Sequence, residues 1–361
     1  MKKLPRIPLL LPGMVGLLAG VLSGLARQGL DQPAFALAQA GNHGALMITA
    51  FLGTVISLER AVALGRGWPY LGPVSAGLAG LALLAGLPLW LVQALAIMAS
   101  LVLLAASAQV LRLQPVLHNA TLALGALCWL IGSLVWFVGG VIPHAVPWWM
   151  AFLVLTIAGE RLELTRFMPA TRGKQPAFIV IVSVLLAGLI ATLTFQSQGL
   201  ALVAAGLLAL SAWLLRYDIA RRTVRQQGLT RFIAVCLLAG YVWLALGGLL
   251  GLTGGFEPGH AWRDAALHAV FLGFVFSMIF GHAPIIFPAV ARIKLPYHPV
   301  FYLPLLLLHG SLLLRLGAGL LGASRPDGLL PLRQAASAAN GMALALFVVI
   351  VVTSVLRARR R

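Results

Sequence analysis

The chain has 361 residues, of which 61% are hydrophobic and only 9% are charged. Soluble domains carry a charge on roughly 25% of their residues, so this composition excludes a soluble protein and predicts an all-α polytopic membrane protein. The net charge of +18 does not indicate a nucleic-acid partner, because every second loop is basic, as the cytoplasmic loops of a membrane protein are.

A helix that spans a membrane needs about 20 mainly apolar residues. On that criterion we expect about twelve transmembrane helices, with the lipid bilayer as their partner. In chain order they cover residues 7–26, 35–63, 69–87, 88–111, 117–140, 144–167, 177–196, 198–217, 230–253, 264–291, 298–321 and 331–357. The boundary between the third and the fourth, at Gly86-Leu87-Pro88, is the least distinct.

Lysine and arginine predict the orientation of these helices. Basic residues precede the first helix, follow every second helix and close the chain: Lys2, Lys3, Arg6, Arg60, Arg66, Arg112, Arg166, Arg172, Lys174, Arg216, Arg221, Arg222, Arg225, Arg231, Arg292, Lys294, Arg357, Arg359, Arg360 and Arg361. Cytoplasmic loops collect basic residues. We therefore expect a multi-pass protein of the inner (plasma) membrane with both termini in the cytoplasm.

Two segments share one layout of a histidine, an apolar run and a Glu-Arg pair. They are "GNHGALMITAFLGTVISLER", residues 41–60, and "IPHAVPWWMAFLVLTIAGER", residues 142–161. The matching positions are His43 and His144, Phe51-Leu52 and Phe152-Leu153, and Glu59-Arg60 and Glu160-Arg161. The shared spacing indicates an internal repeat.

A second pair of matching segments extends this repeat. "LCWLIGSLVWFVGG", residues 127–140, matches "VCLLAGYVWLALGG", residues 235–248, at a cysteine and three glycines. Together the two pairs of matching segments predict one transmembrane domain, residues 1–361, built from three four-helix modules that cover approximately 1–113, 114–226 and 227–361. Small residues at helical spacing let helices approach closely, so we expect the glycines to be packing residues.

His43 and His268 are the first candidate site residues. They lie on the predicted second and tenth helices, which run in the same direction. At ~1.5 Å per residue, each is roughly 30–36 Å from the cytoplasmic end of its helix, so their depths are similar. Similar depth on parallel helices is necessary for two histidines to bind one haem. The alternative is that each bonds to a hydroxyl or a carbonyl group across a helix interface.

His282 and His309 are the second candidate pair. They lie on the adjacent tenth and eleventh helices, each roughly 15–16 Å from the turn that joins them. Two imidazoles that face each other in apolar surroundings can hold a haem iron or form part of a copper site. The alternative is that each histidine bonds to a hydroxyl or a carbonyl group across a helix interface.

The charged pairs Glu59-Arg60 and Glu160-Arg161 end their helices on the cytoplasmic side. An arginine at a helix C-terminus is favoured by the helix dipole, and adjacent residues do not face each other on a helix. We therefore expect a structural role, with ion-pair partners elsewhere; proton gating by the carboxylate is the alternative.

The helix pattern resembles that of subunit I of the haem–copper oxidases, which implies a low-spin haem between His43 and His268. The copper-centre histidines of those oxidases do not carry over, because the predicted seventh helix has no histidine. "HAVFLGFVFSM", residues 268–278, is similar to the H-A-x-x-x-G-x-x-x-x-M pattern of the NnrS family. This resemblance implies a haem- and copper-containing membrane protein of the response to nitric oxide and other nitrogen oxides. The second helix departs from the NnrS pattern, since it has only "NHGAL" where that family has a histidine-rich start.

Three functions follow from these patterns. The first is a haem- or copper-binding membrane protein that handles a small redox or gaseous ligand. The second is a secondary transporter with histidines along its substrate path, since repeats of helices are also typical of transporters. The third is an assembly factor. No catalytic residue is predicted, and the sequence has no C-x-x-C-H haem-attachment motif.

Overall fold

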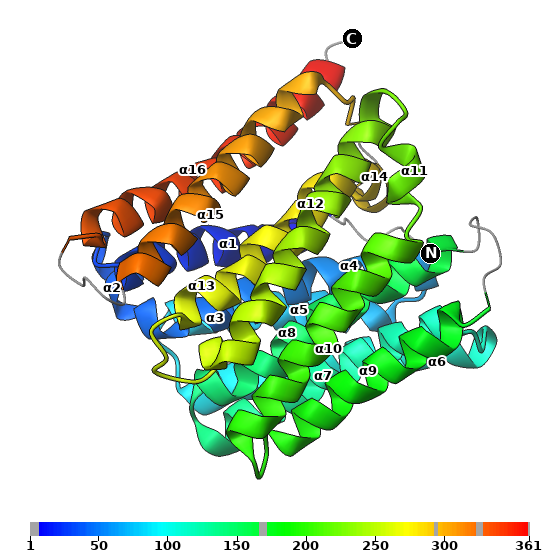
Figure 1. Ribbon diagram of the computed structural model, residues 1–361, viewed down its shortest axis with the longest axis horizontal. Coiled ribbons are helices and arrows are strands. Elements are labelled where there is room, and N and C mark those ends of the chain that lie inside the picture. Colours follow the sequence, from blue (N-terminus) through cyan, green and yellow to red (C-terminus); the bar gives the residue numbers. More distant parts are fainter. Residues whose placement is uncertain (1–6, 166–171, 292–294, 323–327, 360–361) are drawn as a thin grey trace. The chain divides into compact units, whose positions relative to one another are not determined.

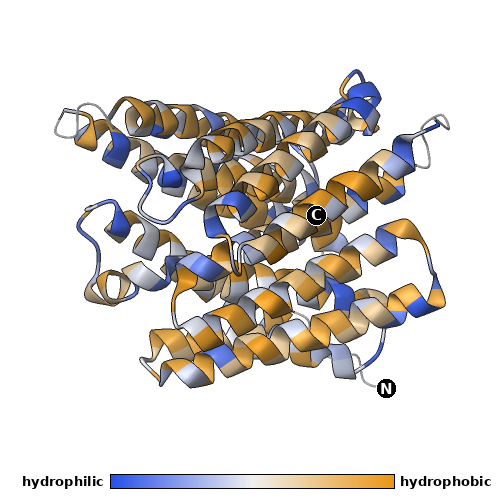
Figure 2. Ribbon diagram, turned by 60° about the horizontal axis from the view of Figure 1, so that its bottom comes forward, coloured by the Kyte–Doolittle hydropathy of each residue, from blue (hydrophilic) through white to orange (hydrophobic). Residues whose placement is uncertain are grey.

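The computed structural model describes residues 7–165, 172–291, 295–322 and 328–359. These ranges are helical and contain no strand, which confirms the predicted all-α polytopic fold. Part of the basic set that predicts the topology lies outside them: Lys2, Lys3, Arg6, Arg166, Arg292, Lys294, Arg360 and Arg361. Hydrophobic residues follow the lengths of the helices, and hydrophilic residues gather at helix ends and connections (Figure 2).

The chain divides into two compact units. Unit 1 contains the described residues of Met1–Gly159 and Pro288–Arg292, and unit 2 those of Glu160–Phe287 and Ile293–Arg361. The predicted boundaries of the three modules remain a prediction.

The helices of unit 1 come in this order (Figure 1): α1 (Ile7–Arg27), α2 (Ala34–Ala38), η1 (Ala40–Asn42), α3 (His43–Ala45), η2 (Leu46–Gly53), α4 (Thr54–Leu64), η3 (Trp68–Tyr70), α5 (Leu71–Leu84), α6 (Leu89–Leu113), α7 (Leu117–Gly139) and most of α8 (Ile142–Leu164). The segments α3, η2 and α4 continue one another as a single long helix, and η2 is its π-helical part.

The helices of unit 2 complete the chain: α9 (Lys174–Ala191), α10 (Gln196–Tyr217), α11 (Ala220–Thr223), α12 (Gly228–Leu250), η5 (Gly251–Gly255), α13 (Arg263–His268), η6 (Ala269–Phe276), α14 (Ser277–Ala291), η7 (Pro299–Phe301), α15 (Tyr302–Gly322) and α16 (Leu330–Arg359). Here α13, η6 and α14 form one long helix, and η6 is π-helical. Two pairs within the unit pack side by side, α9 with α10 and α15 with α16 (Figure 1).

Eleven helices in the described ranges are long and apolar enough to cross a membrane. The third predicted span, residues 69–87, is a shorter apolar helix over Trp68–Leu84. The connection between α5 and α6 falls at the least distinct predicted boundary, Gly86-Leu87-Pro88. Gly86 takes a positive φ of 69°, and Pro88 directly precedes the first residue of α6.

The second, sixth and tenth predicted helices are the most buried spans of the described chain. Within an apolar 18-residue stretch of each span, 72% of the residues are buried in Ala40–Leu64, 78% in Ile142–Leu164 and 61% in Arg263–Pro288, against 56% or less in the other eight. A transmembrane helix that is covered on most sides contacts protein rather than lipid. These three helices also carry most of the candidate site residues.

Close glycine contacts hold the second helix of unit 1 in place. A Cβ on Gly16 of α1 would lie 2.9 Å from Cβ of Ala50, and a Cβ on Gly80 of α5 would lie 2.5 Å from the same atom. Ala50 is therefore enclosed by glycines of two neighbouring helices. Gly20 and Gly24 of α1 continue the contact along η2 and α3, against Met47 and His43.

The packing role predicted for the echoed glycines is confirmed for Gly132, Gly240, Gly247 and Gly248, since a Cβ at each would meet a neighbouring helix within 3 Å. Gly139 and Gly140 behave differently. A Cβ at either position would meet no atom of another described part of the chain within 4 Å, and Gly140 ends α7 with a left-handed φ of 68°. This conformation suits glycine because it has no Cβ.

Candidate functional site

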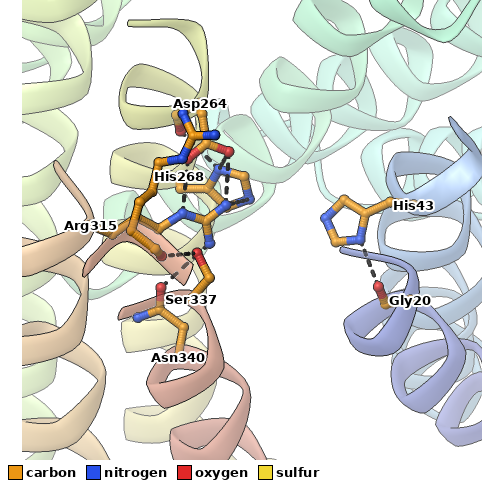
Figure 3. Close-up of polar contacts among 8 residues, drawn as sticks. Gly20, His43, Asp264, His268, Arg315, Ser337 and Asn340 are labelled. Carbon is orange, nitrogen blue, oxygen red and sulfur yellow. Dashed lines mark hydrogen bonds and ion pairs between the residues drawn. The ribbon is translucent and has the colours of Figure 1, made fainter. Parts of the chain in front are cut away.

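His43 lies in unit 1 as the first residue of the short α3, three residues before the π-helical η2 begins at Leu46. Its Nδ1 is 2.7 Å from the carbonyl oxygen of Gly20 on α1 (Figure 3). The imidazole also packs on Gly24, where a Cβ would approach its Cε1 to 2.7 Å. Glycine at position 24 thus lets the ring lie against the backbone of α1.

His268 lies in unit 2 at the corresponding point of the tenth helix, as the last residue before the π-helical η6. Its Nδ1 is 2.8 Å from the carbonyl oxygen of Asp264, one turn earlier, and 3.3 Å from the Asp264 carboxylate. Its Nε2 lies 3.4 Å from Nη2 of Arg315 (Figure 3).

Arg315 organises the polar cluster around His268. Its Nε and Nη2 donate to the two carboxylate oxygens of Asp264 at 2.9 and 2.8 Å, which is a bidentate ion pair. Its Nη1 donates to Oδ1 of Asn340 at 3.4 Å, and Nδ2 of Asn340 donates to Oγ of Ser311 at 2.6 Å. Arg315 and Asn340 are buried. Polar groups of α13, α15 and α16 therefore meet at one place in unit 2 (Figure 3).

The contacts at His43 and His268 define the same tautomer. A carbonyl oxygen only accepts hydrogen bonds, so the Nδ1 atom beside it carries the proton. Nε2 is then the nitrogen with the lone pair. A histidine that binds a metal through one ring nitrogen usually donates its other N–H to a carbonyl or a carboxylate in this way.

A second cluster surrounds His282, also within unit 2. Its Nδ1 donates to the carbonyl oxygen of Met278 at 2.7 Å, and its Nε2 accepts from Nη1 of Arg161 at 3.2 Å. Nε of Arg161 donates to the Asp218 carboxylate at 2.8 Å, and this ion pair is buried, with side chains 3% and 0% exposed. The other Asp218 oxygen accepts the backbone N–H of Ala220 at 2.7 Å.

The two clusters of unit 2 share one arrangement. In each, a histidine of the tenth helix donates Nδ1–H to a carbonyl oxygen one turn earlier, and an arginine lies at its Nε2. In each, an aspartate holds that arginine. In each cluster the carboxylate thereby compensates the arginine charge beside the histidine.

His309 belongs to neither cluster. Its Nδ1 accepts from the indole N–H of Trp243 at 2.8 Å, so its proton is on Nε2, which lies 3.4 Å from Oγ of Ser277. The structure thus gives His282 and His309 separate hydrogen-bond partners, as in the alternative to a shared metal. Among the described residues, no three side chains of His, Cys, Asp or Glu are grouped so that they could hold a metal ion.

The repeated Glu-Arg pairs have different surroundings. Arg161 is buried against Asp218, whereas Arg60 is half-buried and acts electrostatically on Glu59 beside it. Glu160 is half-buried and acts electrostatically on Arg161. The histidines that open the two segments differ as well, because His144 is exposed while His43 is bound to α1.

Three charged residues of these clusters are missing from the sequence prediction: Asp218, Asp264 and Arg315. A signal for Arg315 exists, since an arginine within "LLLRLGAG" is a charged group inside a predicted span. Asp264 stands at the start of the tenth span and Asp218 directly after α10. Their position at helix ends makes them indistinguishable, by sequence alone, from residues exposed to water.

Comparison with known families adds one finding. The family described as "Domain of unknown function (DUF8744)" matches residues 6–356 of the chain. No curated protein matches it. The family description assigns no activity or cofactor, so the geometry of the clusters carries the functional argument.

Proposed function

We propose that this chain, a member of the DUF8744 family, is a multi-pass membrane protein that binds haem, for which His43 in unit 1 and His268 in unit 2 would each supply an iron ligand. One observation carries the proposal. Each of these imidazoles is fixed through Nδ1 to a main-chain carbonyl oxygen, at 2.7 Å for His43 and 2.8 Å for His268. Such a bond orients the ring and leaves Nε2 as the nitrogen for iron.

The helix geometry supports the same residues. His43 is followed closely by the π-helical η2 and His268 directly by the π-helical η6, each eight residues long. π-Helical segments are uncommon and occur frequently at functional sites. Small residues surround both histidines in the sequence, including Gly44, Ala45, Ala265 and Ala269, and side chains of this size let a flat macrocycle approach a helix.

Arg315 is compatible with this role of His268. Its 3.4 Å contact with Nε2 is longer than an ordinary hydrogen bond, whereas its two bonds to Asp264 are 2.9 and 2.8 Å. Haem held at Nε2 of His268 would have to displace this longer contact, while the two bonds of Arg315 to Asp264 could remain. Haem, when bound, would supply a redox-active iron, as the likeness to the NnrS family suggests.

Copper is the other cofactor that the sequence suggests, with His282 and His309 as ligands. Binding there would have to displace Arg161 from Nε2 of His282 or Trp243 from Nδ1 of His309. Both donors are held within the protein, so haem takes precedence in our proposal. For the orientation we propose cytoplasmic termini in an inner membrane, on the basic loops.

Absorption spectroscopy tests the haem proposal. Protein purified from haem-replete cells should show a Soret band with low-spin character, and His43→Ala and His268→Ala should each alter or abolish it. His144→Ala and His298→Ala are matched controls, because both histidines are exposed, and they should leave the spectrum unchanged. A correctly folded but colourless preparation would refute the proposal.

A secondary transporter is the second candidate. Charged side chains inside membrane spans are costly and are usually functional, and unit 2 buries Arg161 and Arg315 in two spans. Substrate-dependent flux in proteoliposomes, lost in Arg315→Met and unaffected by added haem, would favour the transporter. Absence of flux together with a histidine-dependent Soret band would favour the haem protein.

A further inference from the structure

The segment that joins α10 to α12 in unit 2 carries a concentration of positive charge that the proposed haem site does not use. Residues 216–231, which we call the arginine connector, contain five exposed arginines: Arg216, Arg221, Arg222, Arg225 and Arg231. None of the five forms an ion pair with another residue in the described part of the chain.

Asp218 is the one acidic residue of the arginine connector, and it is turned away from the surface. One of its carboxylate oxygens accepts from Nε of Arg161 at 2.8 Å, and the other accepts the backbone N–H of Ala220 at 2.7 Å. Both oxygens are therefore engaged inside the protein. The exposed surface of the connector has five positive charges and no carboxylate that compensates them.

Hydrogen bonds hold the connector in a folded turn. The bond from Ala220 to Asp218 lies at the start of α11 (Ala220–Thr223), and α11 packs beside α12 (Figure 1). Nη1 of Arg221 donates to the carbonyl oxygen of Arg216 at 2.9 Å, which brings Arg221 back to the end of α10. The arginines thus extend from one short, structured connection.

This connection lies at the ends of two helices that are long and apolar enough to span a membrane, Gln196–Tyr217 and Gly228–Gly255. A chain that leaves one span and enters the next after so few residues stays close to the lipid headgroups. Anionic headgroups attract clusters of four or more basic residues that directly adjoin a membrane span.

Aromatic residues beside Arg231 support this depth. The buried ring of Phe232 packs on Tyr297 and Tyr302, with ring centroids 5.8 and 5.1 Å apart. Arg231 acts electrostatically on both tyrosines. Tyrosine is enriched where a membrane meets water, so the surroundings of Arg231 are those expected of a side chain at headgroup level.

We propose that the arginine connector binds the phosphate groups of anionic lipid headgroups. A guanidinium donates two parallel hydrogen bonds to a phosphate, and it stays charged at every physiological pH. Orientation in the membrane requires only that the loop be basic; the proposal adds that the folded protein holds anionic lipid at this place. It is independent of haem, because it concerns other residues and another ligand.

Energy transfer to labelled lipid tests the proposal. Gln226 is an exposed residue of the connector, whereas Cys128 and Cys236 are buried, so Gln226→Cys takes a thiol-reactive fluorescent donor selectively. The full chain with this reporter is placed in phosphatidylcholine vesicles that contain a small fraction of acyl-labelled acceptor lipid, either phosphatidylglycerol or phosphatidylcholine. Transfer should be severalfold more efficient to phosphatidylglycerol at equal mole fraction. The readout is a ratio between two lipids, so bound haem affects both measurements alike.

Loss of positive charge from the connector should remove this preference. Each basic residue near an anionic membrane surface contributes roughly a fivefold gain in association. Substitution of Arg222, Arg225 and Arg231 by Gln in the reporter protein should therefore bring transfer to phosphatidylglycerol down to about the level of phosphatidylcholine. Arg225→Gln alone leaves four arginines to orient the loop, and it should give an intermediate preference if the triple variant does not fold.

The control is Arg27→Gln, an exposed arginine at the end of α1 and on the opposite side of the membrane in the predicted topology. It should leave the preference unchanged. Inorganic phosphate that replaces chloride at constant ionic strength should also leave it unchanged; full displacement of phosphatidylglycerol would assign the connector to a free anion and overturn the lipid proposal. Equal transfer to the two lipids in the parent reporter overturns it too, as does an undiminished preference in the triple and the single variant.

Discussion

The buried ion pair between Arg161 and Asp218 allows a quantitative prediction. Asp218→Asn keeps the shape of the side chain but leaves Arg161, which is 3% exposed, without its carboxylate. Removing one partner of a buried pair typically costs 3–5 kcal/mol, because the other charge stays buried and uncompensated. The amide can still accept one hydrogen bond from Arg161, so we expect about 3 kcal/mol, the lower end of this range.

The two cysteines allow the free energy of unfolding to be measured directly. Cys128 and Cys236 are the chain's two cysteines and both are free and buried, so a thiol-reactive fluorophore reports unfolding in detergent. Asp31→Asn is the matched control, since Asp31 is exposed and its substitution should cost less than about 0.5 kcal/mol. The double variant Arg161→Met with Asp218→Leu should be more stable than Asp218→Asn, because it leaves no buried charge. An Asp218→Asn protein as stable as Asp31→Asn would refute this account of the pair.

Three further predictions concern a glycine contact, a histidine hydrogen bond and the orientation of the C-terminus. Gly16→Ala should destabilise the protein by about 1–3 kcal/mol, because the new Cβ would lie 2.9 Å from Ala50, whereas Gly310→Ala, with open space around it, should be neutral or stabilising in the same thiol assay. Trp243→Phe should cost about 1–3 kcal/mol by removing the indole donor from Nδ1 of His309, and a shift of the His309 nitrogen resonances checks that this bond is the one lost. A reporter that is active only in the periplasm should be inactive when fused after Arg361; activity there would contradict the predicted orientation.

Helix positions could be predicted from the sequence because they depend on short-range composition. Runs of apolar residues of membrane-spanning length mark the helices directly, and the break before Pro88 shows in a Gly-Leu-Pro triplet. The short α5 shows the limit of that criterion: residues 69–87 are apolar enough to resemble a span, yet the helix ends at Leu84. Apolar composition alone does not tell where the backbone turns.

The polar clusters could be predicted only in part, because a hydrogen-bond partner depends on tertiary packing. His268 and His282 stand out in the sequence as ionisable residues inside a span. Arg161, which bonds to His282, is distant from it in sequence. Asp218, which pairs with Arg161, lies directly after α10. The π-helical segments beside His43 and His268 have no sequence signal that distinguishes them from apolar α-helix. The sequence thus indicates which side chains are unusual without indicating what they bind.

The repeated segments show how a shared sequence layout can differ from a shared structure. In the sequence match, Phe51 corresponds to Phe152. The contacts that each segment makes with the helix before it give a different correspondence. Gly13 meets Thr54, whose hydroxyl bonds to the Ala50 carbonyl, and Gly125 meets Thr156, whose hydroxyl bonds to the Phe152 carbonyl. The packing is therefore shifted by one residue relative to the sequence match.

The π-helical η2 gives a physical reason for this shift. A π-helical turn holds more residues than an α-helical turn, and η2 lies within the first segment, whereas α8 is α-helical over the matching residues. Residues on either side of η2 thus lie at different angles around the helix axis from their counterparts in α8. The same reasoning explains why Arg60 and Arg161 have different surroundings although their sequence positions match. A repeat of this kind preserves glycine-mediated packing between a central helix and its neighbour, and it leaves each copy free to place its charged residues against different partners.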